Sequence, residues 1–150
     1  DDDTAINTVL AAHPDIFNHN LETVQRLTPG VRSVATYARS LSVLKKVKSR
    51  APKLYTKSGL MLGLGETEEE LRQALHDLRE ARCDLLTLGQ YLQPTSKHLP
   101  VVEFIHPDKF AEHKETAEAM GFLHVASGPL VRSSYHADDF LPDAFKHGQD

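Results

Sequence analysis

The fold is decided by residues 54–90, which read LYTKSGLMLGLGETEEELRQALHDLREARCDLLTLGQ. This stretch begins with an apolar, strand-like run at residues 54–62 and ends with a second one at residues 85–88. Between the two runs, Thr67 and Glu70 have the spacing of a capping box, in which each side chain bonds the other residue's backbone N–H at a helix start. We therefore predict a strand, a helix and a second strand, in that order.

The same alternation continues on both sides of this unit. The N-terminal side predicts a helix over residues 5–12, a strand over 15–20, a helix over 21–27, a turn at Thr28-Pro29-Gly30 and a helix over 37–48. The C-terminal side predicts a helix that begins at Pro107 and ends at Gly121, and then a strand over residues 122–126. Alternating helices and buried strands predict parallel βα units in an α/β sheet or barrel.

The composition is that of one globular domain. The chain has 150 residues, 40% of them hydrophobic and 25% charged, which is enough apolar material for a core. The net charge is −4 and the basic residues are dispersed except at residues 45–50, where they close a predicted helix, so a nucleic-acid surface is disfavoured. No apolar run reaches the roughly 18 residues of a membrane helix, and the chain starts with three aspartates, unlike a signal peptide. We expect a soluble, intracellular protein, and the non-methionine start suggests a piece of a longer one.

Candidate ligand residues follow the predicted strands, because parallel βα folds bind ligands at the carboxyl ends of their strands. The first strand is followed by Asn18, Asn20 and Glu22, and period-two alternation places the two asparagines on one side. Amides and a carboxylate suit ribose hydroxyls or an amino group. The alternative interpretation is a turn followed by a helix-start acid.

The second and third strands end in further candidates. Gly63 and Gly65 would let a ligand approach the backbone, although the lone GxG lacks the spacing of dinucleotide-binding or phosphate loops. Glu66 either belongs to this site or is a helix-start acid. Gln90 could read an adenine edge with its amide, and a polar loop explains it equally well.

A dense polar cluster, GPLVRSSYHA, occupies residues 128–137, and it predicts either a site or a capped turn. The single cysteine, Cys83, excludes an internal disulfide and a cysteine-based metal site built by this chain alone, and we predict that it is a small core residue. His98 and His106 are isolated in loops and are expected at the surface. Ser134 and His136 are too close in sequence for a nucleophile and base pair of the triad type.

Taken together, the stretches FNHNLETV, TKSGLMLGLGETEEE, LLTLGQYLQP, HLPV and AEAMGFLHVASGPLVRSSYHAD closely resemble the C-terminal half of the lipoyl synthases, a family of radical S-adenosylmethionine enzymes. The resemblance covers residues 5–138 in the family's order and leaves residues 139–150 as a variable tail. It implies the C-terminal part of a partial TIM-like (β/α)6 barrel with parallel strands and outer helices. The implied reaction inserts two sulfur atoms at C6 and C8 of a protein-bound octanoyl group.

The resemblance also implies cofactors and partners. The cofactors are S-adenosylmethionine and two 4Fe-4S clusters, one of which is the auxiliary cluster that serves as the sulfur source. The acceptors are octanoylated lipoyl domains of 2-oxoacid dehydrogenases and the glycine-cleavage H protein, and the electron donor is a flavodoxin or ferredoxin. A bacterial cytoplasm is favoured over an organelle. The family's two three-cysteine cluster motifs lie upstream of the region matched here, so the isolated 150-residue chain is expected to be inactive.

Individual residues carry over by the same resemblance. Ser134 resembles the serine that ligates the auxiliary cluster, Ser133 is the alternative ligand, and Arg132 helps to hold the motif. The S-adenosylmethionine site takes in the three candidates after the first strand and the strand end at residues 59–66, which packs on adenine. Arg39 is a candidate for the methionine carboxylate, or else an exposed helix arginine.

Two other functions compete with this interpretation. One is a different radical S-adenosylmethionine enzyme of sulfur insertion, such as a biotin-synthase-like protein, and the RSSYHAD ending at residues 132–138 argues against it. The other is a non-catalytic remnant that only binds S-adenosylmethionine. The sequence immediately upstream would separate a truncated enzyme from such a remnant.

Overall fold

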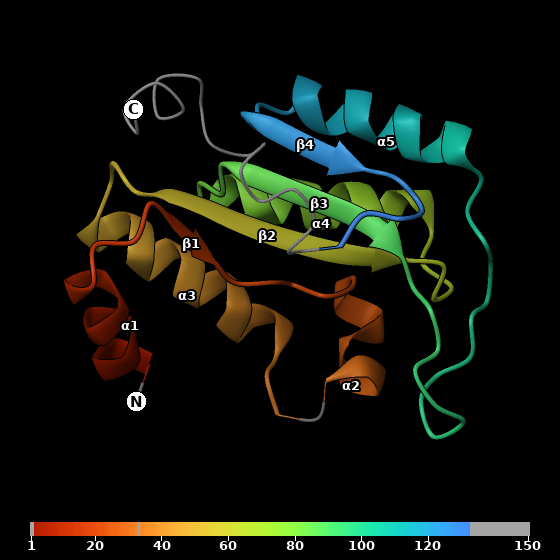
Figure 1. Ribbon diagram of the computed structural model, residues 1–150, viewed down its shortest axis with the longest axis horizontal. Helices are drawn as coiled ribbons and strands as arrows, with labels where there is room; N and C mark the ends of the chain where they lie inside the picture. Colours follow the sequence, from red (N-terminus) through yellow and green to blue (C-terminus); the bar gives the residue numbers. More distant parts are fainter. Residues whose placement is uncertain (1, 33, 133–150) are drawn as a thin grey trace.

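The computed structural model describes residues 2–32 and 34–132, and its centre is a parallel β-sheet (Figure 1). In the described part of the chain the sheet has four strands, β1 (Ile16–Asn18), β2 (Tyr55–Leu62), β3 (Leu85–Gln90) and β4 (His124–Ser127), in the order β1-β2-β3-β4. Each neighbouring pair is parallel. The predicted α/β class with parallel strands and outer helices is therefore confirmed, and an open parallel sheet is consistent with part of a barrel.

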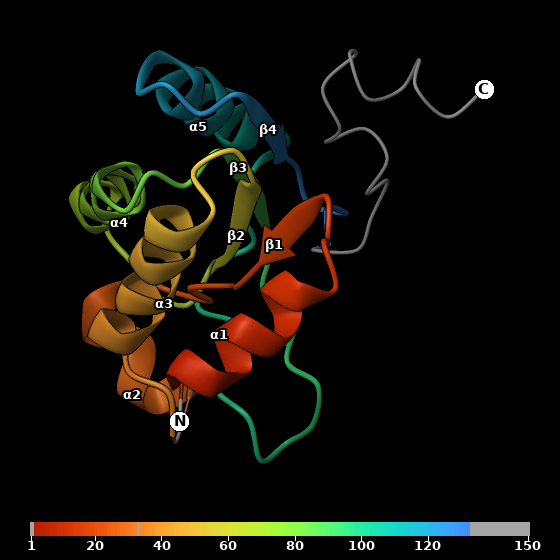
Figure 2. The ribbon, with the colours of Figure 1, turned by 90° about the vertical axis from the view of Figure 1, so that its left-hand side faces the viewer.

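The helices connect the strands and lie outside the sheet. They are α1 (Asp2–Ala11), α2 (Thr28–Val31), α3 (Tyr37–Arg50), α4 (Glu68–Glu80) and α5 (Pro107–Ala119), with a short 3-10 helix at Gln25–Leu27. Figure 2 shows α3, α4 and α5 along one side of the sheet. None of the helices in the described ranges is both long enough and apolar enough to cross a membrane.

The core lies between the sheet and these helices. Alternate residues of β2 and β3 point toward the helices, and they include Leu60, Leu62, Leu86 and Leu88, all at most 3% exposed. They pack against the apolar stripe of α4, namely Leu71, Ala74, Leu75 and Leu78. The intervening residues of the same two strands, among them Gly59, Met61, Thr87 and Gly89, point to the opposite face, which we call the inner face.

Local sequence signals explain where the helices begin and end. The predicted capping box is present, because the Thr67 hydroxyl accepts from Glu70 N and the Glu70 carboxylate accepts from Thr67 N. Pro107 occupies the first turn of α5, and Gly121, which follows that helix, has φ +103° as a helix-ending glycine requires. The basic run that closes α3 pairs partly with the first turn of α1, through Lys46 and Arg50 to Asp3.

Two local predictions are wrong. Residues 21–27 were expected to form a helix, but Glu22 has φ +74° and pairs with β2 through Glu22 N to Gly59 O (3.0 Å) and Met61 N to Glu22 O (2.9 Å). The backbone groups of Glu22 thus bond the edge of β2 and not neighbouring residues within a helix. Within residues 21–27, only Gln25–Leu27 form a helical turn, and it is a 3-10 turn. The expected turn at Thr28-Pro29-Gly30 is instead the first part of α2, with proline in its first turn. The predicted tail at residues 139–150 lies outside the described residues.

Candidate functional site

Two adjoining pockets lie at the carboxyl ends of the strands. The first, which we call the inner pocket, has a volume of about 230 Å³ and is lined by Asn20, Glu22, Gly59, Leu60, Met61, Thr87, Gly89, Gln90, Leu92, Val131 and Arg132. The second, the outer pocket, measures about 500 Å³ and is lined by Glu22, Gly30, Val31, Arg32, Met61, Tyr91, Leu92, Pro94, Lys97, His98, Leu99 and Pro100. Glu22, Met61 and Leu92 belong to both linings. The two pockets therefore lie at the edge of the sheet where parallel βα folds bind ligands.

Asn20 brings an unsatisfied acceptor to the inner pocket. Its side-chain oxygen Oδ1 is buried and has no hydrogen-bond partner among the described residues. It lies 3.2 Å from the position that a Cβ of Gly59 would take, so the glycine leaves room beside it. Buried polar atoms are nearly always paired, and an unpaired one in a pocket indicates a donor on a ligand or water.

Glu22 is held at the junction of the two pockets by its own backbone. Its N–H and C=O both bond β2, at Gly59 and Met61, which imposes the positive φ of +74°. A non-glycine residue in this conformation is strained and is common at ligand sites. The half-buried carboxylate has no ion-pair partner within residues 2–32 and 34–132, so it is available to a ligand.

Arg32 supplies a half-buried guanidinium to the outer pocket, and the sequence analysis missed it. Its Nη1 donates to Ser40 Oγ (2.7 Å) and to the backbone oxygen of Asn20 (3.3 Å), while His19 Nε2 lies 3.2 Å from the same Ser40 hydroxyl. Burial, followed by the positive charge of Arg32, lowers the pKa of His19 and favours its neutral form. Arg32 directly follows α2 and not a strand, so the strand-end rule that selected Glu22 did not select it.

Five predicted site residues lie outside both pocket linings, and two of them, Arg39 and Asn18, lie on exposed parts of the chain. Arg39 is on the exposed first turn of α3, where its Nη2 and Nε bond the two carboxylate oxygens of Asp2 at 2.7 and 3.0 Å. Its guanidinium is thereby committed to α1, and its side chain is 52% exposed. Asn18 ends β1 as an exposed residue and is part of neither lining.

Gly63, Gly65 and Glu66 form a closed turn beside the pockets. The Glu66 carboxylate accepts from Gly63 N at 2.7 Å and from Leu64 N at 3.2 Å, and both glycines have positive φ, +99° and +102°. Burial raises the pKa of Glu66, although these N–H groups oppose the shift. The structure thus gives all three residues a role in shaping the end of β2.

Gln90 lines the inner pocket with an amide that is already occupied. Its Nε2 donates to Tyr91 O and Glu103 O, both at 3.0 Å, and its Oε1 accepts from Ile105 N at 2.8 Å. A side-chain amide has two donor hydrogens, and both have partners here. Gln90 therefore clamps residues 103–105 to the end of β3.

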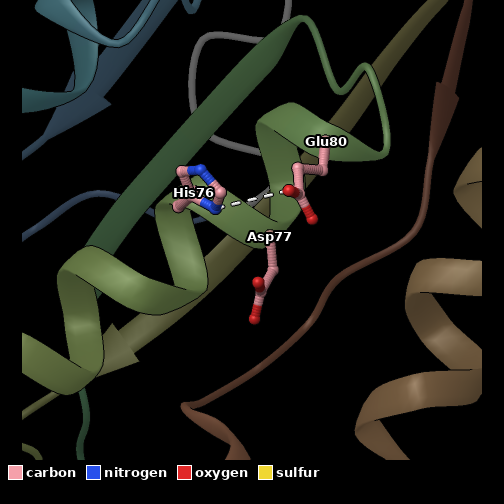
Figure 3. Close-up of side chains that lie close together, drawn as sticks. All are labelled: His76, Asp77 and Glu80. Atoms are coloured by element: carbon pink, nitrogen blue, oxygen red, sulfur yellow. Dashed lines mark ion pairs between the residues drawn. The ribbon is translucent and has the colours of Figure 1, made fainter.

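Outside the pockets, the described residues include a buried cysteine and a group of three possible metal ligands on α4. Cys83 is fully buried, and burial raises the pKa of its thiol to about 12, which confirms it as a core residue. On α4, His76, Asp77 and Glu80 lie together (Figure 3), but the Asp77 oxygens accept from Tyr37 Oη (2.6 Å) and Gln73 Nε2 (2.9 Å). That cluster is explained by helix packing and surface charge.

The predicted cluster ligands Ser133 and Ser134 lie outside the described residues. The chain leading to them is described, and it reaches the inner pocket through Val131 and Arg132. Arg132 Nη1 donates to Val131 O (2.7 Å) and Pro129 O (3.3 Å), so its guanidinium partly fixes its own segment.

The parallel sheet, with helices on one face and a pocket at its strand ends, defines an α/β protein and is consistent with part of a barrel. The chain is 56% identical over 144 residues to the lipoyl synthase of Geobacillus thermodenitrificans, covering 96% of this chain and 48% of that protein. It is 56% identical over 138 residues to the lipoyl synthase of Caldicellulosiruptor saccharolyticus (92% and 48%), and 54% identical over 142 residues to that of Halalkalibacterium halodurans (95% and 47%). The chain is a homologue of lipoyl synthases and spans about half the length of the curated relatives it matches. No family model matches it.

Proposed function

We propose that the protein to which this chain belongs is a lipoyl synthase, a sulfurtransferase that inserts two sulfur atoms at C6 and C8 of a protein-bound octanoyl group. The observation that carries this proposal is the 56% identity to lipoyl synthase over 96% of the chain. The position of the pockets at the strand ends supports it, because radical chemistry needs a closed site that excludes water.

S-adenosylmethionine fits the donors and acceptors of the two pockets. When bound and reduced, it supplies the radical chemistry that removes hydrogen from the octanoyl chain. Asn20 Oδ1 would accept from a ribose hydroxyl or amino group, and the Glu22 carboxylate would accept from a second such donor. Met61, Tyr91 and Leu92 would cover the adenine and exclude water.

For the methionine carboxylate we propose Arg32. Its guanidinium lies in the outer pocket near Glu22 and uses only Nη1 for the bonds described above, which leaves Nε and Nη2 for a bidentate pair. Arg39, the residue expected from sequence, would have to leave Asp2 to play this role. Arg39 is the competing candidate for the methionine carboxylate, and substitution of each arginine distinguishes the two.

The described residues do not fit an iron-sulfur cluster. Cys83, the chain's one cysteine, is buried in the core away from both pockets, with a thiol that stays protonated. Ser134, with Ser133 as the alternative, is our proposed oxygen ligand of the auxiliary cluster, and the thiolate ligands of both 4Fe-4S clusters would come from outside this chain. No reaction step is derived through either cluster.

The proposed partners follow from the same activity. They are octanoylated lipoyl domains of 2-oxoacid dehydrogenases and the glycine-cleavage H protein as acceptors, and a flavodoxin or ferredoxin as electron donor, in a bacterial cytoplasm. Gly63, Gly65, Glu66 and Gln90 are proposed to shape the cofactor site indirectly, through the strand ends and loops that they hold, and Asn18 is proposed to lie outside it.

The full-length protein, with its clusters reconstituted, tests the proposal. Mass spectrometry of an octanoylated lipoyl domain should show the gain of two sulfur atoms, and the isolated 150-residue chain should show none. Asn20→Ala should weaken S-adenosylmethionine binding about tenfold, from the loss of one buried hydrogen bond, while Asn18→Ala at the exposed end of β1 should not. S-adenosylmethionine binding without any sulfur insertion would instead support a non-catalytic remnant.

A further inference from the structure

The segment from Gly128 to Arg132 crosses the inner face of the sheet at the inner pocket. Gly128 N donates to Leu88 O at 3.1 Å, which ties the start of the segment to β3. Val131 N donates to Gly128 O at 3.2 Å, which closes a tight turn and brings the chain back over the strand. Val131 and Arg132 then form one wall of the inner pocket.

The point where this segment meets the sheet is Gly89. A Cβ at Gly89 would come well within 3.0 Å of the Val131 carbonyl oxygen, a separation that real Cβ atoms essentially never show, and 3.4 Å from Arg132 Nη1. The carbonyl belongs to the backbone, so it cannot rotate away as a side chain would. Only glycine allows this approach.

Glycine at this position has no benefit for the strand itself. It packs nothing and weakens a strand interior, whereas Leu86 and Leu88 beside it are fully buried in the core. Gly89 has no positive φ that would require glycine for backbone reasons, unlike Gly63. The close approach of the Gly128–Arg132 segment is therefore the physical reason for glycine at residue 89.

We propose that Gly89 is a positioning residue, whose missing Cβ sets the path of the Gly128–Arg132 segment over the inner pocket and thereby the point from which Ser133 and Ser134 continue. The inference rests on the proposed function, in which one of these serines ligates the auxiliary cluster. Alanine at residue 89 would push the segment away by about 1 Å, to an ordinary carbon–oxygen contact. A misplacement of this size in a reacting geometry lowers a rate on the order of 10²-fold.

The test compares Gly89→Ala with Gly128→Ala in the full-length protein. Gly128→Ala is a matched control from the same segment, because its Cβ would lie 3.6 Å from Val131 Cγ2, an ordinary contact. Hydrogen exchange followed by mass spectrometry should be about tenfold faster in peptides covering residues 128–132 of Gly89→Ala, with the protection of β2 and α4 unchanged. Lipoyl product should fall about 10²-fold in the same variant.

A truncation guards against a variant that fails to fold. A protein truncated after Gly128 lacks the Val131 carbonyl with which the new Cβ would collide. Gly89→Ala should therefore lower the unfolding temperature of the full-length protein but not that of the truncated protein, which lacks residues 129–150. Equal exchange in the two alanine variants, or equal destabilisation in both backgrounds, would overturn the inference. A wild-type protein without lipoylation activity would overturn the proposed function and leave the exchange result to decide the role of Gly89.

Discussion

Replacing Gln90 with leucine separates two roles for this residue, a clamp within the protein and a reader of the nucleotide. The clamp is the set of three hydrogen bonds from its amide to Tyr91, Glu103 and Ile105. Leucine fills a similar volume but leaves one backbone N–H and two carbonyls without their partner. Only 5% of Gln90 is exposed, so water has little access to the three backbone groups that would lose their partner.

Each lost bond costs about 1 kcal/mol when water reaches part of the site, so Gln90→Leu should destabilise the protein by about 3 kcal/mol. For a chain of this size range, that corresponds to a fall of roughly 6–12 °C in the unfolding temperature. Gln73→Leu is the matched control, because Gln73 is exposed on α4 and makes a single side-chain bond, to Asp77. We expect that control to lose less than about 1 kcal/mol.

Thermal unfolding of the full-length protein without S-adenosylmethionine measures the clamp directly. If Gln90→Leu and Gln73→Leu unfold at the same temperature, the clamp contributes nothing and the reasoning is wrong. If, in addition, Gln90→Leu binds S-adenosylmethionine about tenfold more weakly, its amide reads the nucleotide, as the sequence pattern alone allowed.

Four further predictions address the other assigned residues. Arg32→Gln should weaken S-adenosylmethionine binding tenfold or more, because it removes a charge-assisted pair of bonds, and Arg39→Gln should change the affinity less than about twofold. Calorimetry of the full-length protein measures both affinities, and a larger loss in Arg39→Gln than in Arg32→Gln would contradict the assignment. Ser134→Ala should abolish insertion of the second sulfur, so a full yield of the two-sulfur product by mass spectrometry would remove Ser134 as the proposed ligand. The guanidinium of Arg26 holds the pKa of Glu70 at about 2, below its usual 4.5, so the stabilisation from Glu70 is present above pH 4.5 and is lost as the pH falls to 2. The unfolding temperatures of wild type and Glu70→Gln should therefore converge over that range, and a constant difference would refute the assignment. Cys83 should resist iodoacetamide in the folded protein and react in urea, and rapid labelling of the folded protein would contradict its burial.

The parts of the fold that sequence predicted are those fixed by neighbours along the chain. Thr67 and Glu70 are three residues apart, and their capping box starts α4 where the pattern indicated. The apolar runs at residues 54–62 and 85–88 likewise located β2 and β3. These signals need no knowledge of the tertiary structure.

The errors come from partners far away in the sequence. Glu22 leaves the helical conformation because its backbone pairs with Gly59 and Met61, nearly forty residues later. Arg39 was a reasonable anion ligand by residue type, but Asp2 lies opposite it once α1 packs on α3. Arg32 was overlooked because its access to the outer pocket depends on where α2 ends, and no local pattern states that.

The two faces of the sheet have opposite requirements, with leucines of β2 and β3 on the helix-facing side and the glycines at residues 59 and 89 on the inner face. Leucines fill the helix-facing side, where every added methylene is buried and contributes to stability. On the inner face, a Cβ at Gly59 would collide with the Thr87 hydroxyl, and a Cβ at Gly89 would collide with the Val131 carbonyl. Stability alone would favour larger side chains there, since glycine weakens a strand. Both glycines line the inner pocket, and Gly59 is explained by the neighbouring Thr87, Gly89 by the segment that approaches β3, and the leucines by what the strands must hold together.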